Sequence, residues 1–375
     1  VDLIITSVPF ATQYEYTPCY DEHTEVLTRS GWRSFGEITL DDSLATVNPA
    51  TRCLEWQAPS GIVWQPYDGP MLHFRGRNSF DLLVTPDHKM FVDTRVGNLK
   101  TGRKTTKYDF VRAERVAEIF AHRKWRMVTG LTAGAGMRPA FIDIPASGQR
   151  VMPRSRHIAR IATEDFMALA GWYLSEGSCR DGSVVSRRGE ISIAQSAVHP
   201  AHRKEIIDLF RRIGLPTNAN HATSIRAWNI SVADYLRAQF GLGSYSKRIP
   251  RWVKDLHPDL LRILRDTMMK GDGNANGMAY TSVSKSLRDD FQEVCLLTGW
   301  RAAVSGDVVR IGQRSLNPEI RERPQRESYR GMIGCATVPS HTLVVRRNGK
   351  AIVSGNSYND FGHTDNNDHF WAQMD

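Results

Sequence analysis

The sequence has few cysteines, and none of them is placed to form a familiar cysteine site. The chain of 375 residues contains five, an odd number, widely scattered and never in a CxxC pair. This spacing argues against a disulfide framework and against a zinc site of paired cysteines. We therefore expect a protein of the reducing cytoplasm. The five are Cys19, Cys53, Cys179, Cys295 and Cys335.

Long hydrophobic runs are also missing. No apolar run approaches the ~20 residues that a membrane helix needs, so we expect no membrane partner. The opening residues 1–5 are apolar but lack a basic leader, which predicts a buried strand and not a signal peptide. What is present is typical of a globular protein, with 41% hydrophobic and 24% charged residues.

Length and charge suggest several domains and an anionic partner. A chain of 375 residues is too long for one ordinary core, so we expect two or more domains in a monomer. Lys and Arg number 49 against 40 Asp and Glu, which leaves a formal net charge of +9. A basic balance of this size favours a polyanion such as nucleic acid.

The stretch 341–357 predicts a β-hairpin that ends in reactive residues. Two apolar strands are joined by Asn348-Gly349, the strongest short-range hairpin signal. The second strand ends at Asn356, whose side-chain amide can attack its own backbone carbonyl and cleave the chain. The next residue, Ser357, offers a hydroxyl nucleophile that can hold an acyl group.

Far upstream, Cys19 follows Pro18 in front of a run of predicted strands, where a thiol can attack the preceding carbonyl. Together Cys19, Asn356 and Ser357 resemble the splice junctions of an intein. The resemblance implies that residues 19–356 excise themselves without a cofactor. It also implies an acyl shift at Cys19, transesterification to Ser357 and cyclisation of Asn356.

Residues 19–145 contain short predicted strands at 25–27, 43–47, 61–65, 71–74 and 80–85, with turns at 30–31, 48–49 and 68–70. Within them, Thr85 and His88 resemble an intein block whose histidine strains the first junction. Cys335 and His341 resemble the block that acts on the branched intermediate. The resemblance implies that 19–145 and 331–356 form one all-β, horseshoe-like Hint splicing domain. Gly355 departs from it, since most inteins carry histidine there.

Between residues 145 and 331, the spacing of apolar residues changes from the alternation of strands to the period of helices. After a basic linker at 146–160, a helix with Thr163 as its N-cap ends at Glu176-Gly177, and a second runs from Pro258 to Asp272-Gly273. Each is followed by a strand and a helix, an internal duplication that predicts a pseudo-two-fold arrangement. The repeated segments are strands 190–195 and 278–283 and helices 201–213 and 286–297.

Each long helix places an acid before its terminal glycine. A carboxylate there faces the negative end of the helix dipole, which is unfavourable by ~0.3–1 kcal/mol. Two such acids brought together suit Mg²⁺ and metal-assisted phosphodiester hydrolysis. The alternative without a metal-binding role is a pair of solvated acids in helix ends capped by glycine.

The paired helices resemble the LAGLIDADG motifs of DOD-type homing endonucleases, over residues 146–312. The resemblance implies an α+β, pseudo-two-fold domain with Glu176 and Asp272 as the metal-binding acids and Lys247 near the active centre. It implies double-stranded DNA as partner, cut at the uninterrupted host-gene junction. A degenerate domain that binds DNA without cutting is the alternative. Residues 313–330 are charged and interrupted by proline, which predicts a flexible surface loop.

The flanks 1–18 and 357–375 are interpreted as pieces of a host protein. Ser7, Pro9 and Phe10 resemble the motif by which amino-group DNA methyltransferases hold a flipped base, although Val8 departs from it. The resemblance implies S-adenosylmethionine as cofactor of the complete host only. Two rival interpretations remain, a Hint autoprocessing domain without ligation and a methyltransferase in its own right. The lack of a Gly-rich loop beside a strand in either flank argues against the latter.

Overall fold

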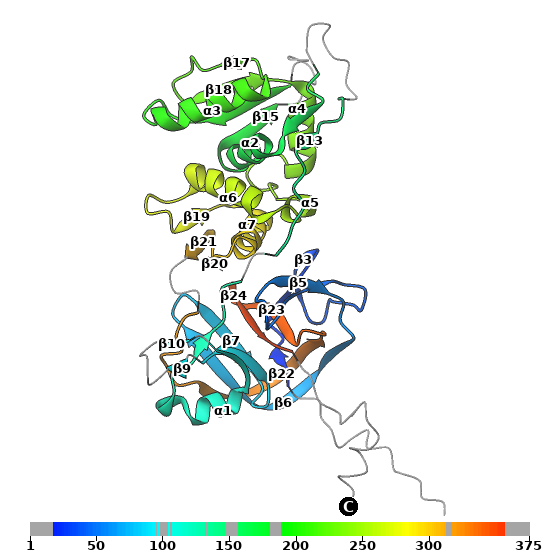
Figure 1. The fold of residues 1–375 in the computed structure, drawn as a ribbon, viewed down its shortest axis with the longest axis vertical. Coiled ribbons are helices and arrows are strands. Elements are labelled where there is room, and N and C mark those ends of the chain that lie inside the picture. Colours follow the sequence, from blue (N-terminus) through cyan, green and yellow to red (C-terminus); the bar gives the residue numbers. More distant parts are fainter. Residues whose placement is uncertain are drawn as a thin grey trace, which may run out of the picture.

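The computed structural model describes the side chains of residues 18–94, 107–131, 134–147, 157–180, 189–312 and 317–356. It also describes the backbone of two short strands, β9 (Val96–Gly97) and β10 (Lys104–Thr105). The protein is rich in β-structure with some helices, arranged in two lobes (Figure 1). One lobe is built of strands from both ends of the described chain, and the other holds the long helices. Within the described ranges, no helix combines the length and apolar character needed to cross a bilayer.

A closed barrel forms the centre of the β-lobe. Its strand order is β1-β22-β6-β7, and all neighbours are antiparallel. Side chains from both the start and the end of the chain fill its core, because β1 lies between β22 and β7. The strands are β1 (Tyr20–Asp21), β6 (Gly61–Gly76), β7 (Phe80–Val84) and β22 (Gln325–Thr337).

A nine-stranded sheet connects the two lobes. The hairpin β23–β24 lies in its middle, with β2 on one side and β20 on the other (Figure 1). The predicted turn of this hairpin is confirmed, with Asn348 and Gly349 at φ of 49° and 71°. The strands are β2 (Glu25–Thr28), β3 (Gly31–Ser34), β4 (Leu44–Val47), β5 (Leu54–Gln57), β19 (Ala279–Thr281), β20 (Arg301–Ser305), β21 (Val308–Gly312), β23 (Thr342–Arg347) and β24 (Lys350–Gly355).

Smaller elements complete the β-lobe. A three-stranded sheet packs beside the barrel and carries a short helix at its end. The elements are β8 (Lys89–Asp93), β11 (Tyr108–Arg112), β12 (Arg126–Met127), α1 (Ala113–Glu118) and a 3₁₀ turn at Phe120–His122.

The helical lobe is organised around α2 (Thr163–Glu176) and α6 (Pro258–Asp272), which lie side by side. A four-stranded sheet of order β15-β16-β18-β17 belongs to the first half, and β19, β20 and β21 belong to the second. The remaining elements are β13 (Phe141–Asp143), β14 (Arg160–Ala162), β15 (Gly177–Arg180), β16 (Glu190–Ala194), α3 (Pro200–Ile213), β17 (Thr217–Asn218), β18 (Ser224–Trp228), α4 (Ile230–Phe240), α5 (Arg251–Lys254) and α7 (Lys285–Leu297).

The contact between α2 and α6 is symmetric. When Glu176-Gly177 is aligned with Asp272-Gly273, Thr267 becomes the counterpart of Gly171, and Gly271 the counterpart of Ser175. A Cβ on Gly171 would lie 2.7 Å from Cβ of Thr267, and one on Gly271 would lie 2.4 Å from Cβ of Ser175. Each residue therefore meets its own counterpart, which is the relation that a pseudo-two-fold axis between two helices produces.

The structure differs from the sequence prediction at several elements. The turn expected at 68–70 does not form, because β22 pairs with β6 along its whole length and keeps the backbone extended. Thr163 is not the N-cap of α2; Ala162 is, and the hydroxyl of Thr163 donates to the carbonyl of Pro139 at 2.6 Å. Within 313–330, expected as a flexible loop, β22 already begins at Gln325.

Candidate functional site

The peptide bond between Pro18 and Cys19 lies between the buried side chains of Thr85 and His88. The amide nitrogen of Cys19 donates to Oγ1 of Thr85 at 3.0 Å. The imidazole of His88 lies beside the backbone of Pro18, which acts to raise the pKa of the ring, and its Nδ1 is buried without a hydrogen-bond partner among the described residues. The two residues that the sequence singles out in the 85–88 segment thus lie next to one peptide group.

A tight turn after β7 brings these two side chains together. The backbone N–H of His88 donates to the carbonyl of Thr85 at 3.1 Å, and that of Thr85 donates to the carbonyl of Cys19 at 3.1 Å. Both side chains are fully buried. The turn therefore fixes their spacing, and the backbone bond to Cys19 fixes their position relative to the Pro18–Cys19 peptide bond.

His88 lies in an apolar and aromatic environment. Its ring meets the edge of the Tyr20 ring at 4.4 Å between centroids, and Nε2 lies 3.3 Å from Oγ of Ser354. Burial lowers the pKa of His88 to about 4, against the opposing effects of the Pro18 backbone and Asp87. At neutral pH the imidazole is uncharged, with an N–H available to the carbonyl oxygen.

The thiol of Cys19 is buried beside that of Cys335. In the barrel, Tyr20 pairs with Gly334, which places the two cysteines next to each other on adjacent strands. Burial raises the pKa of the Cys19 thiol far above its usual range, and Cys335 and Asp87 act in the same direction. The thiol is therefore neutral at rest, and attack on a carbonyl requires its proton to leave during the step.

Asn356 lies at the end of β24 and is 1% exposed. Its backbone N–H donates to the carbonyl of His341 at 3.0 Å, and its side-chain Nδ2 donates to the carbonyl of Val338 at 3.0 Å. Its side-chain oxygen is buried and has no partner among the described residues. The residue after it, Ser357, lies outside the described residues.

Tyr20 connects the segments of Cys19 and Asn356, and sequence reasoning did not find it. Its hydroxyl donates to the carbonyl of Gly355, next to Asn356, while its ring touches His88 and its backbone follows Cys19. Gly355 is also constrained, because a Cβ there would lie 1.9 Å from the carbonyl oxygen of Lys89. The structure therefore brings Cys19, Thr85, His88, Cys335 and Asn356 into one buried region of the β-lobe.

His341 contributes to this region through its backbone. It adopts a left-handed conformation with φ of 58° and is partly buried. Its carbonyl accepts the bond from Asn356, so the turn before β23 and the end of β24 are tied together. This backbone hydrogen bond holds His341 near Asn356.

A second candidate site lies at the carboxyl ends of α2 and α6. Burial raises the pKa of Glu176, and the neighbouring Asp272 raises it further, whereas Lys247 opposes both effects. Burial likewise raises the pKa of Asp272, again opposed by Lys247. The two acids expected from the helix ends therefore interact, and the expected lysine lies beside them.

Lys247 is 5% exposed, and its ammonium group donates to the carbonyl of Gly177 at 2.9 Å. Burial lowers the pKa of Lys247 to about 8, although both acids and Cys179 raise it. A buried cation at the end of α2 partly offsets the unfavourable placement of the two carboxylates against the helix dipoles.

The hydroxyl of Tyr280 is a further polar group at this site that the sequence did not reveal. It is buried and has no partner among the described residues. Burial raises the pKa of Tyr280, and the charges of Asp272 and Glu176 raise it further. Beside Glu176 the surface forms a groove of about 680 Å³, also lined by His199, His202 and Lys270.

These residues are compatible with a divalent cation. Two carboxylates that repel each other present the oxygen donors that Mg²⁺ prefers. Within the described ranges no group of three or more His, Cys, Asp or Glu side chains is arranged to hold a metal ion. An ion bound here would therefore need further ligands from water or phosphate, which is common for Mg²⁺.

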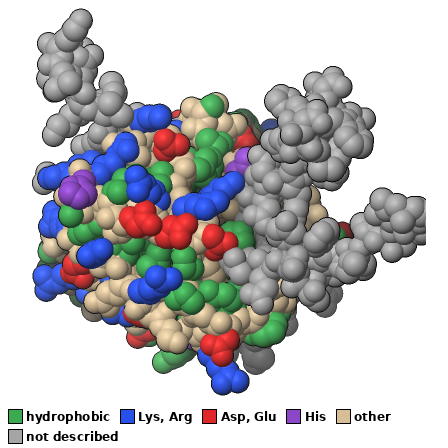
Figure 2. All heavy atoms as spheres, turned by 90° about the horizontal axis from the view of Figure 1, so that it is seen from below, with side chains coloured by type: hydrophobic (Ala, Val, Ile, Leu, Met, Phe, Trp, Pro, Cys, Tyr) green, Lys and Arg blue, Asp and Glu red, His purple; other side chains and the backbone are tan. Residues whose placement is uncertain are grey.

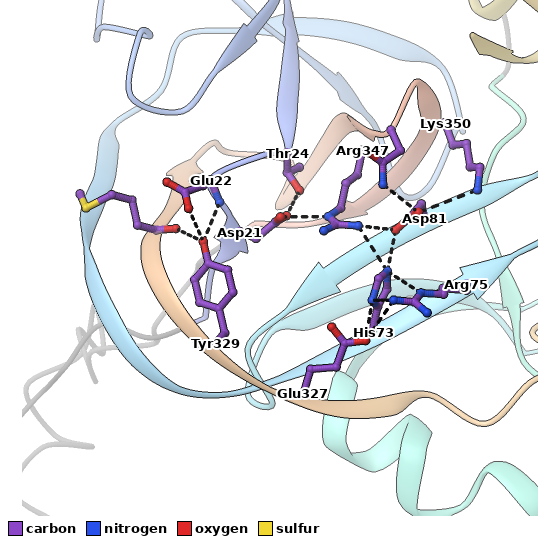
Figure 3. Close-up of polar contacts among 12 residues, drawn as sticks. Asp21, Glu22, Thr24, His73, Arg75, Asp81, Glu327, Tyr329, Arg347 and Lys350 are labelled. Carbon is purple, nitrogen blue, oxygen red and sulfur yellow. Dashed lines mark hydrogen bonds and ion pairs between the residues drawn. The ribbon is translucent and has the colours of Figure 1, made fainter. Parts of the chain in front are cut away.

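A charged network on the barrel joins strands from the two ends of the chain (Figure 3). Arg347 of β23 donates to Asp21 at 2.9 Å and to Asp81 at 2.8 Å. His73 lies 2.8 Å from Asp81 and 2.9 Å from Glu327. Burial acts to raise the pKa of Asp81, but bonds from His73, Asn348 and Arg347 hold it well below its usual range.

The surface of the β-lobe farthest from the helices carries charges of both signs. Figure 2 shows Lys and Arg interspersed with Asp and Glu and with apolar side chains on this face. The part of the face that is visible therefore has no uniform basic patch, and the net charge of +9 is not concentrated there.

The sequence matches no protein-family model. It is 22% identical over 414 residues to the DNA-directed RNA polymerase subunit beta C-terminal section of Stigeoclonium helveticum, covering 90% of this chain and 36% of that protein. It is 21% identical over 292 residues to the ATP-dependent Clp protease proteolytic subunit of Chlamydomonas moewusii, covering 76% of this chain and 28% of that protein.

A third relative is the ribonucleoside-diphosphate reductase subunit beta of Aquifex aeolicus (strain VF5), 23% identical over 369 residues, with 91% of this chain and 50% of that protein covered. The chain thus spans half or less of the length of each of these relatives. Among solved structures, the AceL NrdHF class 3 split intein, in a GSH-linked splice-inactive variant, aligns over 91% of this chain and 99% of that chain. Its sequence identity is 11% and its TM-score 0.29, too low to assign a fold.

Proposed function

We propose that residues 19–356 are an intein of the Hint class that removes itself from a host protein by splicing. The observation that carries the proposal is the position of the Pro18–Cys19 peptide bond between Thr85 and His88. The N–H of Cys19 donates to Thr85, and the buried imidazole of His88 lies beside the backbone of Pro18. A peptide positioned in this way next to a thiol is prepared for attack by that thiol.

In the first step, the sulfur of Cys19 bonds to the carbonyl carbon of Pro18, and the bond from that carbon to the Cys19 nitrogen breaks. The thiol proton passes to the departing α-amine, so a thioester replaces the amide. The neutral imidazole of His88 donates to the carbonyl oxygen, where negative charge develops. This step requires no cofactor.

In the second step, the hydroxyl oxygen of Ser357 attacks the thioester, and the Cys19 thiol leaves with the proton. The side-chain nitrogen of Asn356 then bonds to its own backbone carbonyl carbon. The peptide bond to Ser357 breaks, the excised chain ends in a succinimide, and an O-to-N acyl shift joins Pro18 to Ser357. The buried position of Asn356 and its bonds to Val338 and His341 support this role.

The similar proteins support the interpretation that this chain is an insert within a host protein and not an enzyme on its own. Their names refer to an RNA polymerase subunit, a protease subunit and a reductase subunit, three unrelated activities. Each nevertheless contains a segment similar to most of this chain, and the remaining half or more of each protein is not matched. A sequence shared by otherwise unrelated proteins is what a mobile intein would leave.

Splicing is tested by mass spectrometry of the expressed full chain. The expected products are free residues 19–356 and a peptide joining 1–18 to 357–375. The Cys19→Ala, Asn356→Ala double variant is expected to remain full length. Equal fragmentation of the double variant would assign the cleavage to a contaminating protease. Release of both flanks without ligation would favour the Hint autoprocessing alternative.

A second activity, DNA cleavage by residues 146–312, is favoured by the interacting acids Glu176 and Asp272 beside Lys247. The two carboxylates would hold Mg²⁺, which supplies charge stabilisation to phosphodiester hydrolysis when bound. Lys247 orients the end of α2 and offers a cation to a phosphate. The DNA partner is the uninterrupted host-gene junction.

Endonuclease activity is tested with a DNA duplex that joins the codons for Pro18 and Ser357. The wild-type protein is expected to cut it in the presence of Mg²⁺ and to leave it intact in EDTA. Glu176→Gln and Asp272→Asn are each expected to abolish cutting while splicing continues. Specific binding without cutting by the wild type would assign the lobe to the degenerate, DNA-binding class.

The host is proposed to be a DNA methyltransferase that uses S-adenosylmethionine once spliced. Ser7, Pro9 and Phe10, on which this prediction depends, lie outside the described residues. Methylation of DNA by the complete spliced host protein, and its loss in a Phe10→Ala variant, is the measurement that tests it.

A further inference from the structure

The turn of the hairpin that leads to Asn356 is held by the helical lobe. Gln292 of α7 is fully buried, and its Nε2 donates to the carbonyl of Gly349 at 2.7 Å and to that of Ala302 at 3.0 Å. The backbone N–H of Val304 donates to the same Gly349 carbonyl at 2.9 Å. Both donors to the turn therefore come from the segment 146–312.

Strand β23, which precedes the turn, is also bound to α7 of the helical lobe. Arg346 is 4% exposed, and its Nη1 donates to Asp289 at 2.6 Å and to Oε1 of Gln292 at 3.0 Å. Its Nε donates to Glu25 of β2 at 2.5 Å. One guanidinium thus joins α7 of the helical lobe to two strands of the β-lobe.

The turn of the hairpin also packs directly against β20. Lys350 pairs with Ala303, which makes β24 and β20 neighbours in one sheet. A Cβ on Gly349 would lie 2.2 Å from the carbonyl oxygen of Val304. The apolar residues Val344 and Val353 of the hairpin belong to the same buried cluster as the helices of the other lobe.

The opposite end of the hairpin carries the junction. Gly355 accepts a bond from Tyr20 and lies against Lys89, and Asn356 follows directly. Paired strands transmit a displacement along their length, and every residue of β24 is paired in register with a residue of β23. The position of the turn therefore influences the position of Asn356 at the other end.

We propose that Gln292 is a positioning residue for the Asn356 step, so that cleavage at the second junction depends on docking of the helical lobe against the Asn348-Gly349 turn. This inference rests on the proposed splicing function and on the assignment of 146–312 as the insert. It predicts that the endonuclease segment serves the splicing reaction through its contact with the hairpin.

The experiment measures each junction separately in the full chain. Cleavage after Asn356 is followed in a Cys19→Ala background, and thiol-induced cleavage at Cys19 in an Asn356→Ala background. Gln292→Leu removes the donor to Gly349 while keeping the side chain's bulk. We expect Asn356 cleavage to slow by about tenfold or more, the effect of a small misplacement of reacting groups, with Cys19 cleavage changed less than about twofold.

A second variant avoids dependence on one buried side chain. Gly349→Ala places a methyl group against Val304, and Gly306→Ala is its control, since Gly306 also has positive φ, at 57°, but no atom within 4 Å of a Cβ. We expect Gly349→Ala to slow Asn356 cleavage selectively and Gly306→Ala to leave it unchanged.

Equal slowing at both junctions in Gln292→Leu and Gly349→Ala would mean general destabilisation and would overturn the inference. Unchanged Asn356 cleavage in both would overturn it as well. Hydrogen exchange of the β23–β24 amides supplies a readout that does not depend on splicing, and faster exchange in Gln292→Leu is expected. A wild-type chain that cleaves at neither junction would refute the proposed function, whereas that exchange result would still decide the docking contact.

Discussion

At the scale of single residues, the most informative feature is the uncharged state of the groups around the Pro18–Cys19 peptide. The thiol of Cys19 and the imidazole of His88 are both buried, and burial disfavours the charged form of each. A neutral imidazole can donate a hydrogen bond without the cost of burying a cation. In the proposed splicing reaction, the site would therefore operate through hydrogen bonds and proton transfer within the step.

The depressed pKa of His88 makes folding stability depend on pH. Its folded pKa is about 4 and its ordinary value 6.5, so between these values the unfolded chain binds more protons. Stability is then fully present above 6.5 and falls as pH drops towards 4, by about 3 kcal/mol for this group. Urea unfolding across this range is expected to show the fall in the wild type. His88→Gln serves as the control and is expected to show a smaller fall in stability over the same pH range.

Glycine is required at position 355 because the carbonyl of Lys89 lies close to it, and not because of its own backbone conformation. A Cβ would lie 1.9 Å from the carbonyl oxygen of Lys89, so any side chain, histidine included, must displace β8 or β24. We expect Gly355→Ala to destabilise the protein by about 2 kcal/mol, the order found for overpacked sites. Gly61→Ala is the control, because its Cβ would meet only Thr337 Oγ1 at 3.8 Å. Equal melting temperatures for the two variants would contradict the expectation.

At the scale of elements, the pairing of α2 with α6 depends on small residues at corresponding positions. Gly171 admits Thr267, and Gly271 admits Ser175. The close approach brings the two helix ends together, and with them Glu176 and Asp272. The acids are therefore neighbours because the helices cross at glycine.

A swap across the pseudo-two-fold axis tests this packing. Gly171→Ala alone is expected to destabilise the fold by about 1–3 kcal/mol, although alanine favours a helix, because its methyl group overlaps Thr267. Adding Thr267→Gly vacates the opposite side, and we expect the double variant to regain more than half of the loss. Denaturant midpoints of the wild type, the two single variants and the double variant measure the coupling. Additive losses would show that the two positions do not share one contact.

At the scale of the whole molecule, ion pairs hold together segments from opposite ends of the sequence. Arg347 bonds Asp21, two residues after Cys19, and Asp81 on β7, and its own strand belongs to the hairpin that leads to Asn356. Arg346 adds the helical lobe through Asp289. The protein is thus bound across its lobes by adjacent arginines of one strand.

Loss of the Arg347 contacts is expected to lower the free energy of unfolding. Arg347→Met leaves the carboxylate of Asp21, which is 0% exposed, without its cation, and removes from Asp81, which is 9% exposed, its close Arg347 partner while His73 and Lys350 remain. We expect it to lower the free energy of unfolding by about 3–5 kcal/mol, as for other broken buried pairs. Arg330→Met is the control, because the Arg330–Asp68 pair is 88% and 72% exposed and should contribute about 0–1 kcal/mol. Equal unfolding free energies for the two variants would show that the network contributes no more than a surface pair.

Much of the local structure was predictable from the sequence. Turn chemistry at Asn348-Gly349 predicted the hairpin, and helical period with terminal glycines predicted where α2 and α6 end. The pairing of Glu176 with Asp272 followed from the duplication, and the grouping of Cys19, Thr85 and His88 followed from a resemblance. These signals lie within a few residues of the features they determine, which is why a sequence displays them.

Only the tertiary structure decided which distant groups meet. The continuous β6, in place of a turn at 68–70, depends on β22, which lies far along the chain. Tyr20 reaches Gly355, Tyr280 lies beside the acids, and Gln292 holds Gly349 through contacts between distant segments. Composition and periodicity carry no record of such pairings, because hydrogen bonds and packing across the fold depend on where the chain returns in space.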